Sequence, residues 1–221
     1  MTCAGIDFFD VDHTILRSSS ARHFAIFGVK RGVFPLRALF FIPVYYLYYR
    51  YGSIKTDSFQ QLFPLFRGIP REQLVEISSL SFHEKLKDDI FVEAISLIEH
   101  LKRTGRMVVL ATSSLDLIVE PLADHLGTDA VIASSLEFQG PNELCTGHFT
   151  SPPIFELEKK KRVMEFIESC GLQPKCCSFY SDSIHDLPLL ESVGNPVVVN
   201  PDPRLRRVAE GKGWHVMSFT G

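Results

Sequence analysis

Two pairs of aspartates each follow a short apolar stretch of the chain. Asp10 and Asp12 stand two residues apart, and Asp182 and Asp186 stand four residues apart. Alternation at the end of a strand would point Asp10 and Asp12 to the same side. Such carboxylates can act as a nucleophile, as a general acid and base, and as oxygen ligands for a hard cation such as Mg²⁺. A lone Asp-x-Asp is more often a solvated turn or a helix cap, so the accompanying residues decide.

Hydroxyl and basic side chains accompany these acids. An apolar stretch ends in Thr112, Ser113 and Ser114, and the basic cluster 159–162 opens a helical pattern. A hydroxyl can donate a hydrogen bond to an anion and an ammonium can hold its charge. Consecutive lysines usually form a solvated face, and neighbours on a helix differ by about 100°, so only one lysine can point at a site.

Short apolar stretches that alternate with helical patterns predict a parallel sheet with both faces covered. The predicted strands are 6–9, 107–111, 130–133, 177–180 and 196–199. Apolar positions within 91–101 and 157–167 predict helices that close at Gly105 and Gly171. The fold class is therefore α/β, with a Rossmann-like, doubly wound parallel sheet. The carboxyl ends of its strands would bring the acids, hydroxyls and one lysine to one edge.

One region departs from this alternation. Residues 16–88 show helical periodicity without a convincing strand, which predicts an all-helical cap inserted into a core formed by 1–15 and 89–221. A hairpin is expected from 134–138 and 144–149, which flank the turn residues Gly140-Pro141-Asn142.

Composition narrows the class of protein. Apolar residues make up 45% of the chain and charged residues 22%, as in globular proteins, and the net charge of -3 offers no basic field for nucleic acid. The five cysteines include no C-x-x-C pair, which predicts reduced thiols rather than a disulfide framework or a zinc site. Asp7, Asp10 and Asp12 interrupt any signal-peptide core. We therefore expect a cytoplasmic protein.

The order of these elements resembles the four motifs of the haloacid dehalogenase superfamily. Asp10-x-Asp12-x-Thr14 is the specific part, and the matching pieces span nearly the whole chain. The helical insertion, together with 180–191 and 196–202, is similar to the branch that includes phosphoserine phosphatases, subfamily IB. Two departures from phosphoserine phosphatases put their substrate in doubt. This chain has Ser181 and His185 where they have Gly and Asn, and Thr112-Ser113 where they have Ser-Gly.

The resemblance implies a role for each candidate residue. Asp10 is the nucleophile that forms an aspartyl-phosphate, and Asp12 is the general acid and base. Mg²⁺, the expected cofactor, would be held by Asp10, the backbone carbonyl of Asp12 and Asp182, with Asp186 behind them. The implied phosphate-binding residues are Thr14, Thr112, Ser113, Lys159 and His185. Alignment of the helix selects Lys159, with Lys160 as the alternative.

The expected reaction is Mg²⁺-dependent hydrolysis of a phosphomonoester, with a small phosphorylated metabolite as substrate. Phosphoserine is one alternative. A second is a lipid phosphate of the phosphatidylglycerophosphate type, because the cap contains the uncharged run 38–49 between Arg37 and Arg50. That run is too short to cross a bilayer, which needs about 20 apolar residues, and a buried helix is the favoured interpretation over a lipid-facing surface. A catalytically silent binding module ranks last because all four acids are present. The oligomeric state is left open.

Overall fold

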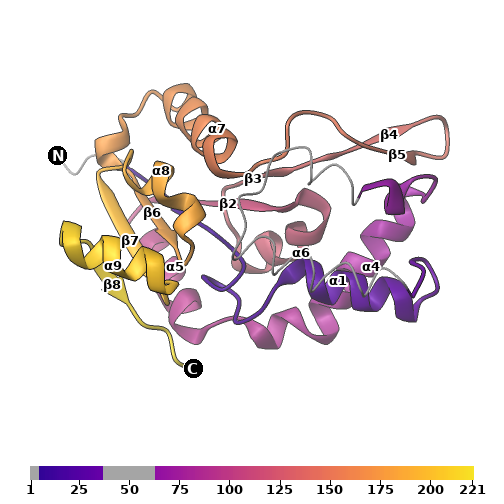
Figure 1. The fold of residues 1–221 in the computed structure, drawn as a ribbon, viewed down its shortest axis with the longest axis horizontal. Coiled ribbons are helices and arrows are strands. Elements are labelled where there is room, and N and C mark those ends of the chain that lie inside the picture. Colours follow the sequence, from indigo (N-terminus) through magenta and orange to yellow (C-terminus); the bar gives the residue numbers. More distant parts are fainter. Residues whose placement is uncertain (1–4, 37–62) are drawn as a thin grey trace.

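A parallel sheet forms the centre of the molecule (Figure 1). The computed structural model describes residues 5–36 and 63–221. Six strands lie in the order β3-β2-β1-β6-β7-β8, which is 3-2-1-4-5-6 when the strands are counted along the chain. They are β1 (Ile6–Phe9), β2 (Met107–Leu115), β3 (Ala130–Ser134), β6 (Ser178–Ser181), β7 (Asn195–Val199) and β8 (His215–Met217). This is the doubly wound order, whose reversal point lies between β1 and β6.

Helices cover both faces of the sheet, and the alternation within β1 shows how. Phe8 packs with buried residues of α7 (Glu156–Ser169), α8 (Leu187–Leu190) and α9 (Pro203–Lys212). Phe9 packs on the other face with α5 (Val92–Arg103) and α6 (Asp116–Leu126). Because both faces are covered, all four residues of β1 are buried. This explains why the strands read as apolar runs without polar alternation.

The described part of the inserted region is helical. It contains α1 (Ser20–Lys30), α4 (Arg71–Glu84) and the short 3-10 turns η1 (Phe63–Phe66) and η2 (Leu86–Asp89). Figure 1 shows α1 and α4 side by side, away from β6, β7 and β8. Their buried side chains share one apolar cluster with Leu117 and Ile118 of α6 and with the hairpin of β4 (Leu136–Gln139) and β5 (Leu144–Phe149). The insertion therefore packs on α6 and on the hairpin, and its limits at 16 and 88 stay a prediction.

All five predicted strands, both predicted helices and the hairpin are present. The sequence interpretation did not locate the core helices α6, α8 and α9. It also missed β8, a three-residue edge strand with no apolar run, and the 3-10 turn η3 (Pro174–Cys176). The expectation that every thiol is reduced is wrong for Cys176, which is disulfide-bonded, because spacing in the sequence does not reveal which sulfurs meet in space. Cys145, Cys170 and Cys177 are free.

The uncharged run 38–49 lies outside the described residues. Within residues 5–36 and 63–221, every helix is too short or too polar to cross a bilayer.

Candidate active site

The candidate residues meet at the carboxyl edge of the sheet, where β1 lies between β2 and β6. Strand β1 ends at Phe9, and the N–H of Asp10 still donates to the carbonyl of Tyr180 at 2.9 Å, so Asp10 continues the ladder with β6. A tight turn follows. The backbone N–H groups of Thr14, Ile15 and Leu16 all donate to the carbonyl of Val11. His13 takes a positive φ of 62°, which reverses the chain. Asp12 therefore lies at the start of a tight turn that directly follows β1.

Lys159 joins the two acid motifs. Its Nζ lies 3.0 Å from Asp10 Oδ1 and 2.8 Å from Asp186 Oδ1, and only 1% of its side chain is exposed. Helix α7 reaches this point because Val163 and Ile167, one and two turns on, are buried against the sheet. A buried ammonium requires such partners, since an unpaired charge in the interior would be very unfavourable. The structure thus selects Lys159 over Lys160, which is only half-buried.

Burial and charge shift the pKa values of this group strongly. Desolvation by burial raises the pKa of Asp10 to about 7, and the nearby Asp186 adds to the rise, while Lys159 opposes it. Burial works against the charged form of Lys159, but Asp10 and Asp186 outweigh it and raise its pKa. The pKa of Asp182 is also raised well above its ordinary value by burial and then by the charge of Asp10. A buried carboxylate whose pKa is raised by neighbouring carboxylates, as Asp182 is by Asp10 and Asp186, attracts a cation.

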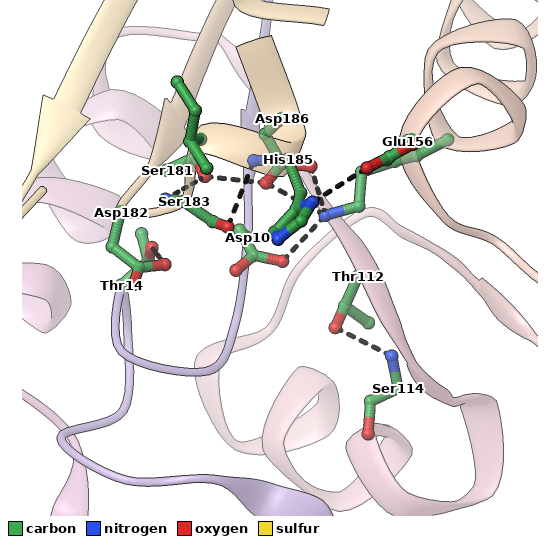
Figure 2. A network of polar contacts seen from close by, with 12 residues as sticks. Asp10, Thr14, Thr112, Ser114, Glu156, Ser181, Asp182, Ser183, His185 and Asp186 are labelled. Carbon is green, nitrogen blue, oxygen red and sulfur yellow. Dashed lines mark hydrogen bonds and ion pairs between the residues drawn. The ribbon is translucent and has the colours of Figure 1, made fainter. Parts of the chain in front are cut away.

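The loop after β6 carries the second acid pair and holds it with serine hydroxyls. Ser181 Oγ donates to Asp186 Oδ2 at 2.6 Å and accepts the backbone N–H of Ser183 at 3.2 Å. Ser183 Oγ accepts the N–H of His185 at 3.3 Å. Asp186 Oδ2 thus accepts hydrogen bonds from both Ser181 Oγ and Lys159 Nζ. The Gly of phosphoserine phosphatases at the position of Ser181 cannot make this contact. Figure 2 shows these side chains grouped around Asp10.

Thr14 lies beside Asp182, a candidate ligand of the cation. Its side chain is fully buried, and Oγ1 donates to Asp182 Oδ1 at 3.4 Å. The structure thus places this hydroxyl next to the carboxylate. Whether Thr14 also binds phosphate stays a prediction.

Asp12 is held by the start of helix α1. Its two carboxylate oxygens accept Ser19 Oγ at 3.0 Å and the backbone N–H of Ser20 at 2.9 Å. Ser20 Oγ in turn lies 3.0 Å from Ser114 Oγ at the end of β2. The Asp12 side chain is therefore positioned by the inserted helix rather than by the sheet, and Ser20 ties that helix to the hydroxyl-rich strand end.

The hydroxyl residues of β2 lie where its pairing with β3 becomes irregular, between Ala111 and Leu115. Thr112 is buried, and its Oγ1 accepts the N–H of Ser114 at 3.1 Å. Ser113 stands between them and is half-buried. A bulge of this kind turns side chains toward the strand end. Figure 2 shows Thr112 and Ser114 on the side of Asp10 away from Asp182, as expected if β1 separates them.

His185 pairs with a residue that the sequence interpretation missed. Its Nδ1 lies 2.8 Å from Glu156 Oε1, and its ring packs against Phe155, with 5.4 Å between ring centroids. Glu156 opens helix α7 with a φ of 41°, an unfavourable conformation for a residue with a side chain. Figure 2 shows the Glu156 side chain pointing at His185, close to Asp10 and Asp186. A charged residue one turn before Lys159 on the same helix was the available signal.

The donor set fits Mg²⁺. Asp10 and Asp182 supply carboxylate oxygens, which a hard cation prefers. Burial, and after it the charge of neighbouring carboxylates, raises the pKa of both groups, so a cation would stabilise their ionised forms. Within the described ranges, no group of three or more His, Cys, Asp or Glu side chains could hold a metal ion by itself. A cation here would therefore need backbone oxygen, such as the carbonyl of Asp12, together with water and phosphate.

Comparison with known proteins decides the family. The family model described as haloacid dehalogenase-like hydrolase matches residues 8–191. The chain belongs to this family. Membership in the haloacid dehalogenase-like hydrolases confirms the resemblance, the fold class and the prediction of an enzyme that hydrolyses its substrate.

Three named proteins are similar in sequence to this chain. The inhibition of morphological differentiation protein of Streptomyces azureus is 33% identical, covering 96% of this chain and 77% of the relative. A histidinol-phosphatase of Neisseria meningitidis is 29% identical, covering 96% and 97%. The phosphoserine phosphatase SerB1 of Mycobacterium tuberculosis is 28% identical, covering 96% and 70%. A substrate-bound phosphoserine phosphatase structure shares the fold, with a TM-score of 0.72, 17% identity, and coverage of 96% of this chain and 91% of that one.

Proposed function

We propose that this chain is a Mg²⁺-dependent phosphomonoester hydrolase that forms an aspartyl-phosphate on Asp10. The carrying observation is the buried ammonium of Lys159, which lies 3.0 Å from Asp10 and 2.8 Å from Asp186 at the reversal point of the sheet. A lysine kept charged beside a carboxylate nucleophile can also bind a phosphate oxygen. The relatives named for an activity are phosphatases, which supports this reaction class.

In the first step a carboxylate oxygen of Asp10 attacks phosphorus, and the bond between phosphorus and the ester oxygen breaks. The leaving oxygen keeps the bonding electrons and takes a proton from Asp12. Lys159 and the hydroxyl of Thr112 would bind the remaining phosphate oxygens as charge moves onto them. Bound Mg²⁺, held by Asp10, the Asp12 carbonyl and Asp182, would supply charge neutralisation between the anionic nucleophile and its anionic substrate.

In the second step water attacks the phosphorus of the aspartyl-phosphate. Asp12, now ionised, accepts the proton of that water, and the carboxylate of Asp10 is regenerated as inorganic phosphate forms. Ser19 and Ser20 hold the Asp12 carboxylate for both transfers through their contacts of 3.0 and 2.9 Å. This is consistent with one residue that serves as acid and then as base.

For the substrate we propose a small metabolite with one phosphate ester. The near-complete mutual coverage with the histidinol-phosphatase favours a phosphate ester of an amino alcohol or an amino acid. Phosphoserine is the second candidate, supported by the relative named for that activity. Ser181, the last residue of β6, and His185, in the loop after it, distinguish this site from the Gly and Asn pattern of phosphoserine phosphatases.

A screen of phosphate release tests the proposal. Histidinol phosphate, phosphoserine, sugar phosphates, nucleotides and micellar phosphatidylglycerophosphate would each be incubated with the protein in Mg²⁺ or in EDTA. Asp10→Asn, purified in parallel, controls for contaminating phosphatase. Mg²⁺-dependent release from a small ester, absent in Asp10→Asn, is the expected result. Release from the lipid alone would contradict the metabolite class, and release unaffected by Asp10→Asn would contradict the mechanism.

A further inference from the structure

The connection between β7 and α9 contains a carboxylate whose oxygens are all in use. Asp202 is the N-cap of α9, where its Oδ1 accepts the backbone N–H groups of Arg204 at 2.7 Å and Leu205 at 3.0 Å. Helix α9 is anchored in turn, because Leu205 and Ala209 are fully buried. Oδ1 of Asp202 therefore acts as an N-cap, a common role of Asp at the start of a helix.

The other half of Asp202 reaches the neighbouring loop. Its Oδ2 accepts the N–H of Ile184 at 2.7 Å, and its own backbone N–H donates to the carbonyl of Asp182 at 2.8 Å. These two hydrogen bonds hold the loop after β6 at Asp182 and at Ile184, on either side of Ser183. Helix capping requires neither of them, so they point to a role for Asp202 outside α9.

We propose that Asp202 is a positioning residue that holds the loop after β6 so that the Asp182 carboxylate is in place to bind the cation. This inference rests on the proposed function, because it concerns the same site. The chain around Asp182 is thus held from α9, an anchored element, in addition to the serine contacts within the loop itself. A ligand that is fixed in advance loses little conformational freedom on binding, which favours affinity.

The electrostatics of the site agree with this assignment. The charge of Asp202 is among the causes that raise the pKa of Asp182, after burial and the charges of Asp10 and Asp186. Asp202 therefore adds to the negative potential that a cation at Asp182 would relieve. Its own carboxylate is stabilised by three N–H donors.

One substitution separates the positioning role from helix capping. Asn caps helices about as well as Asp, so Asp202→Asn can keep its side-chain oxygen on Arg204 and Leu205. Its amide nitrogen would then face the N–H of Ile184, donor against donor, and the loop contact is lost. Asp202→Ala removes the side-chain contacts to Ile184 and to the start of α9, while the backbone N–H of residue 202 can still donate to Asp182. Comparison with Asp202→Asn measures the contribution of the cap.

Asp129→Asn is the matched control. Asp129 Oδ2 accepts the N–H of Val108 at 2.7 Å near the amino end of β2, at the edge of the sheet opposite the site. The same charge is removed, and rotation of the amide can keep that hydrogen bond.

The experiment measures Mg²⁺ binding in two ways on the full chain. The first is the rise in melting temperature with Mg²⁺ concentration, which needs no substrate. The second is the Mg²⁺ concentration that gives half-maximal hydrolysis. We expect Asp202→Asn to need about 10- to 100-fold more Mg²⁺, both for the same rise in melting temperature and for half-maximal hydrolysis. This is the usual effect of losing a contact that orients a metal ligand. At saturating Mg²⁺ its kcat should stay within about threefold of wild type, and its metal-free melting temperature should stay close to wild type.

An unchanged Mg²⁺ requirement in both Asp202→Asn and Asp202→Ala would overturn the positioning role. An equal rise in Asp129→Asn would also overturn it, since the effect would then follow from charge alone. If the wild type itself is neither stabilised by Mg²⁺ nor active with it, the proposed function fails and this inference fails with it. If the wild type needs Mg²⁺ and Asp202→Asn needs the same concentration of it, only this inference is contradicted and the proposed function stands.

Discussion

Lys159 and Asp10 form a buried ion pair, with 3.0 Å between Nζ and Oδ1, although 149 residues separate them in the chain. The same ammonium contacts Asp186. Burial opposes every charge in this group, so its stability depends on each partner being present. The group therefore links the chemistry of the site to the stability of the fold.

Replacing Lys159 should destabilise the fold as well as abolish activity. Lys159→Met leaves Asp10 and Asp186 buried without their cation, which is expected to lower the free energy of unfolding by about 3–5 kcal/mol. Urea unfolding at pH 8 in EDTA measures this change. Lys161→Met is the control, because the Lys161 side chain is 59% exposed and its ion pair with Glu158 is long at 3.8 Å. Equal effects in the two variants would contradict the paired burial of Lys159.

The stability of the metal-free protein should fall as the pH rises from about 4 to about 7. The folded chain raises the pKa of Asp10 from its ordinary 3.8 to about 7, so it holds that proton more tightly than the unfolded chain does. This contribution is complete below about pH 4 and is lost as the pH rises through about 7. The raised pKa of Asp182 acts in the same direction.

Asp10→Asn cannot titrate at this position, so its melting temperature in EDTA should depend less on pH between 4 and 8. Mg²⁺ should stabilise wild type more at pH 8 than at pH 5, because the cation favours the ionised carboxylates. Melting curves across this pH range, with and without Mg²⁺, check the prediction. A parallel pH dependence in wild type and Asp10→Asn would exclude Asp10 as the source.

Asp12→Asn should separate the two chemical steps. An aryl phosphate with a good leaving group needs little protonation, so attack by Asp10 should survive better than hydrolysis of the aspartyl-phosphate, which needs a base. Phosphate label should then accumulate on the protein, while steady-state turnover falls by about 100-fold or more. Mass spectrometry of the quenched reaction would locate the label. Absence of label, together with full loss of turnover, would argue against this division of roles.

The pair formed by Glu156 and His185 should affect phosphate binding. Glu156→Ala removes the carboxylate that lies 2.8 Å from His185 Nδ1 and should loosen the imidazole. We expect KM for the ester and the inhibition constant of inorganic phosphate each to rise about tenfold, as for loss of a contact that orients a functional side chain. Glu156→Gln keeps an acceptor oxygen and should restore most of the affinity. If Glu156→Ala weakens binding just as much in a His185→Ala background, Glu156 does not act through His185.

The pattern of the sequence was sufficient for the family, for five of the six strands of the parallel sheet and for the acid pairs. The residue pattern of a strand is a local property of the sequence. When helices cover both faces of a sheet, each strand is a short run of apolar residues. The carboxyl ends of parallel strands meet at one edge whatever the loops do, so Asp10, Thr112 and Asp182 could be brought together from the sequence alone. Helix α7 was equally visible, but three adjacent lysines left the choice open between Lys159 and Lys160.

Only the tertiary structure decided which side chains hold one another. Burial of Val163 and Ile167 turns Lys159 inward, and no local pattern contains the distance to Asp10. The N–H of Ser20 donates a hydrogen bond to Asp12, and the N–H of Ile184 donates one to Asp202. Each of these bonds joins two segments whose directions depend on packing elsewhere. Hydrogen bonds between loops are set by the relative placement of whole elements. The sequence determines them only through the complete fold, whereas the strands follow from a few consecutive residues.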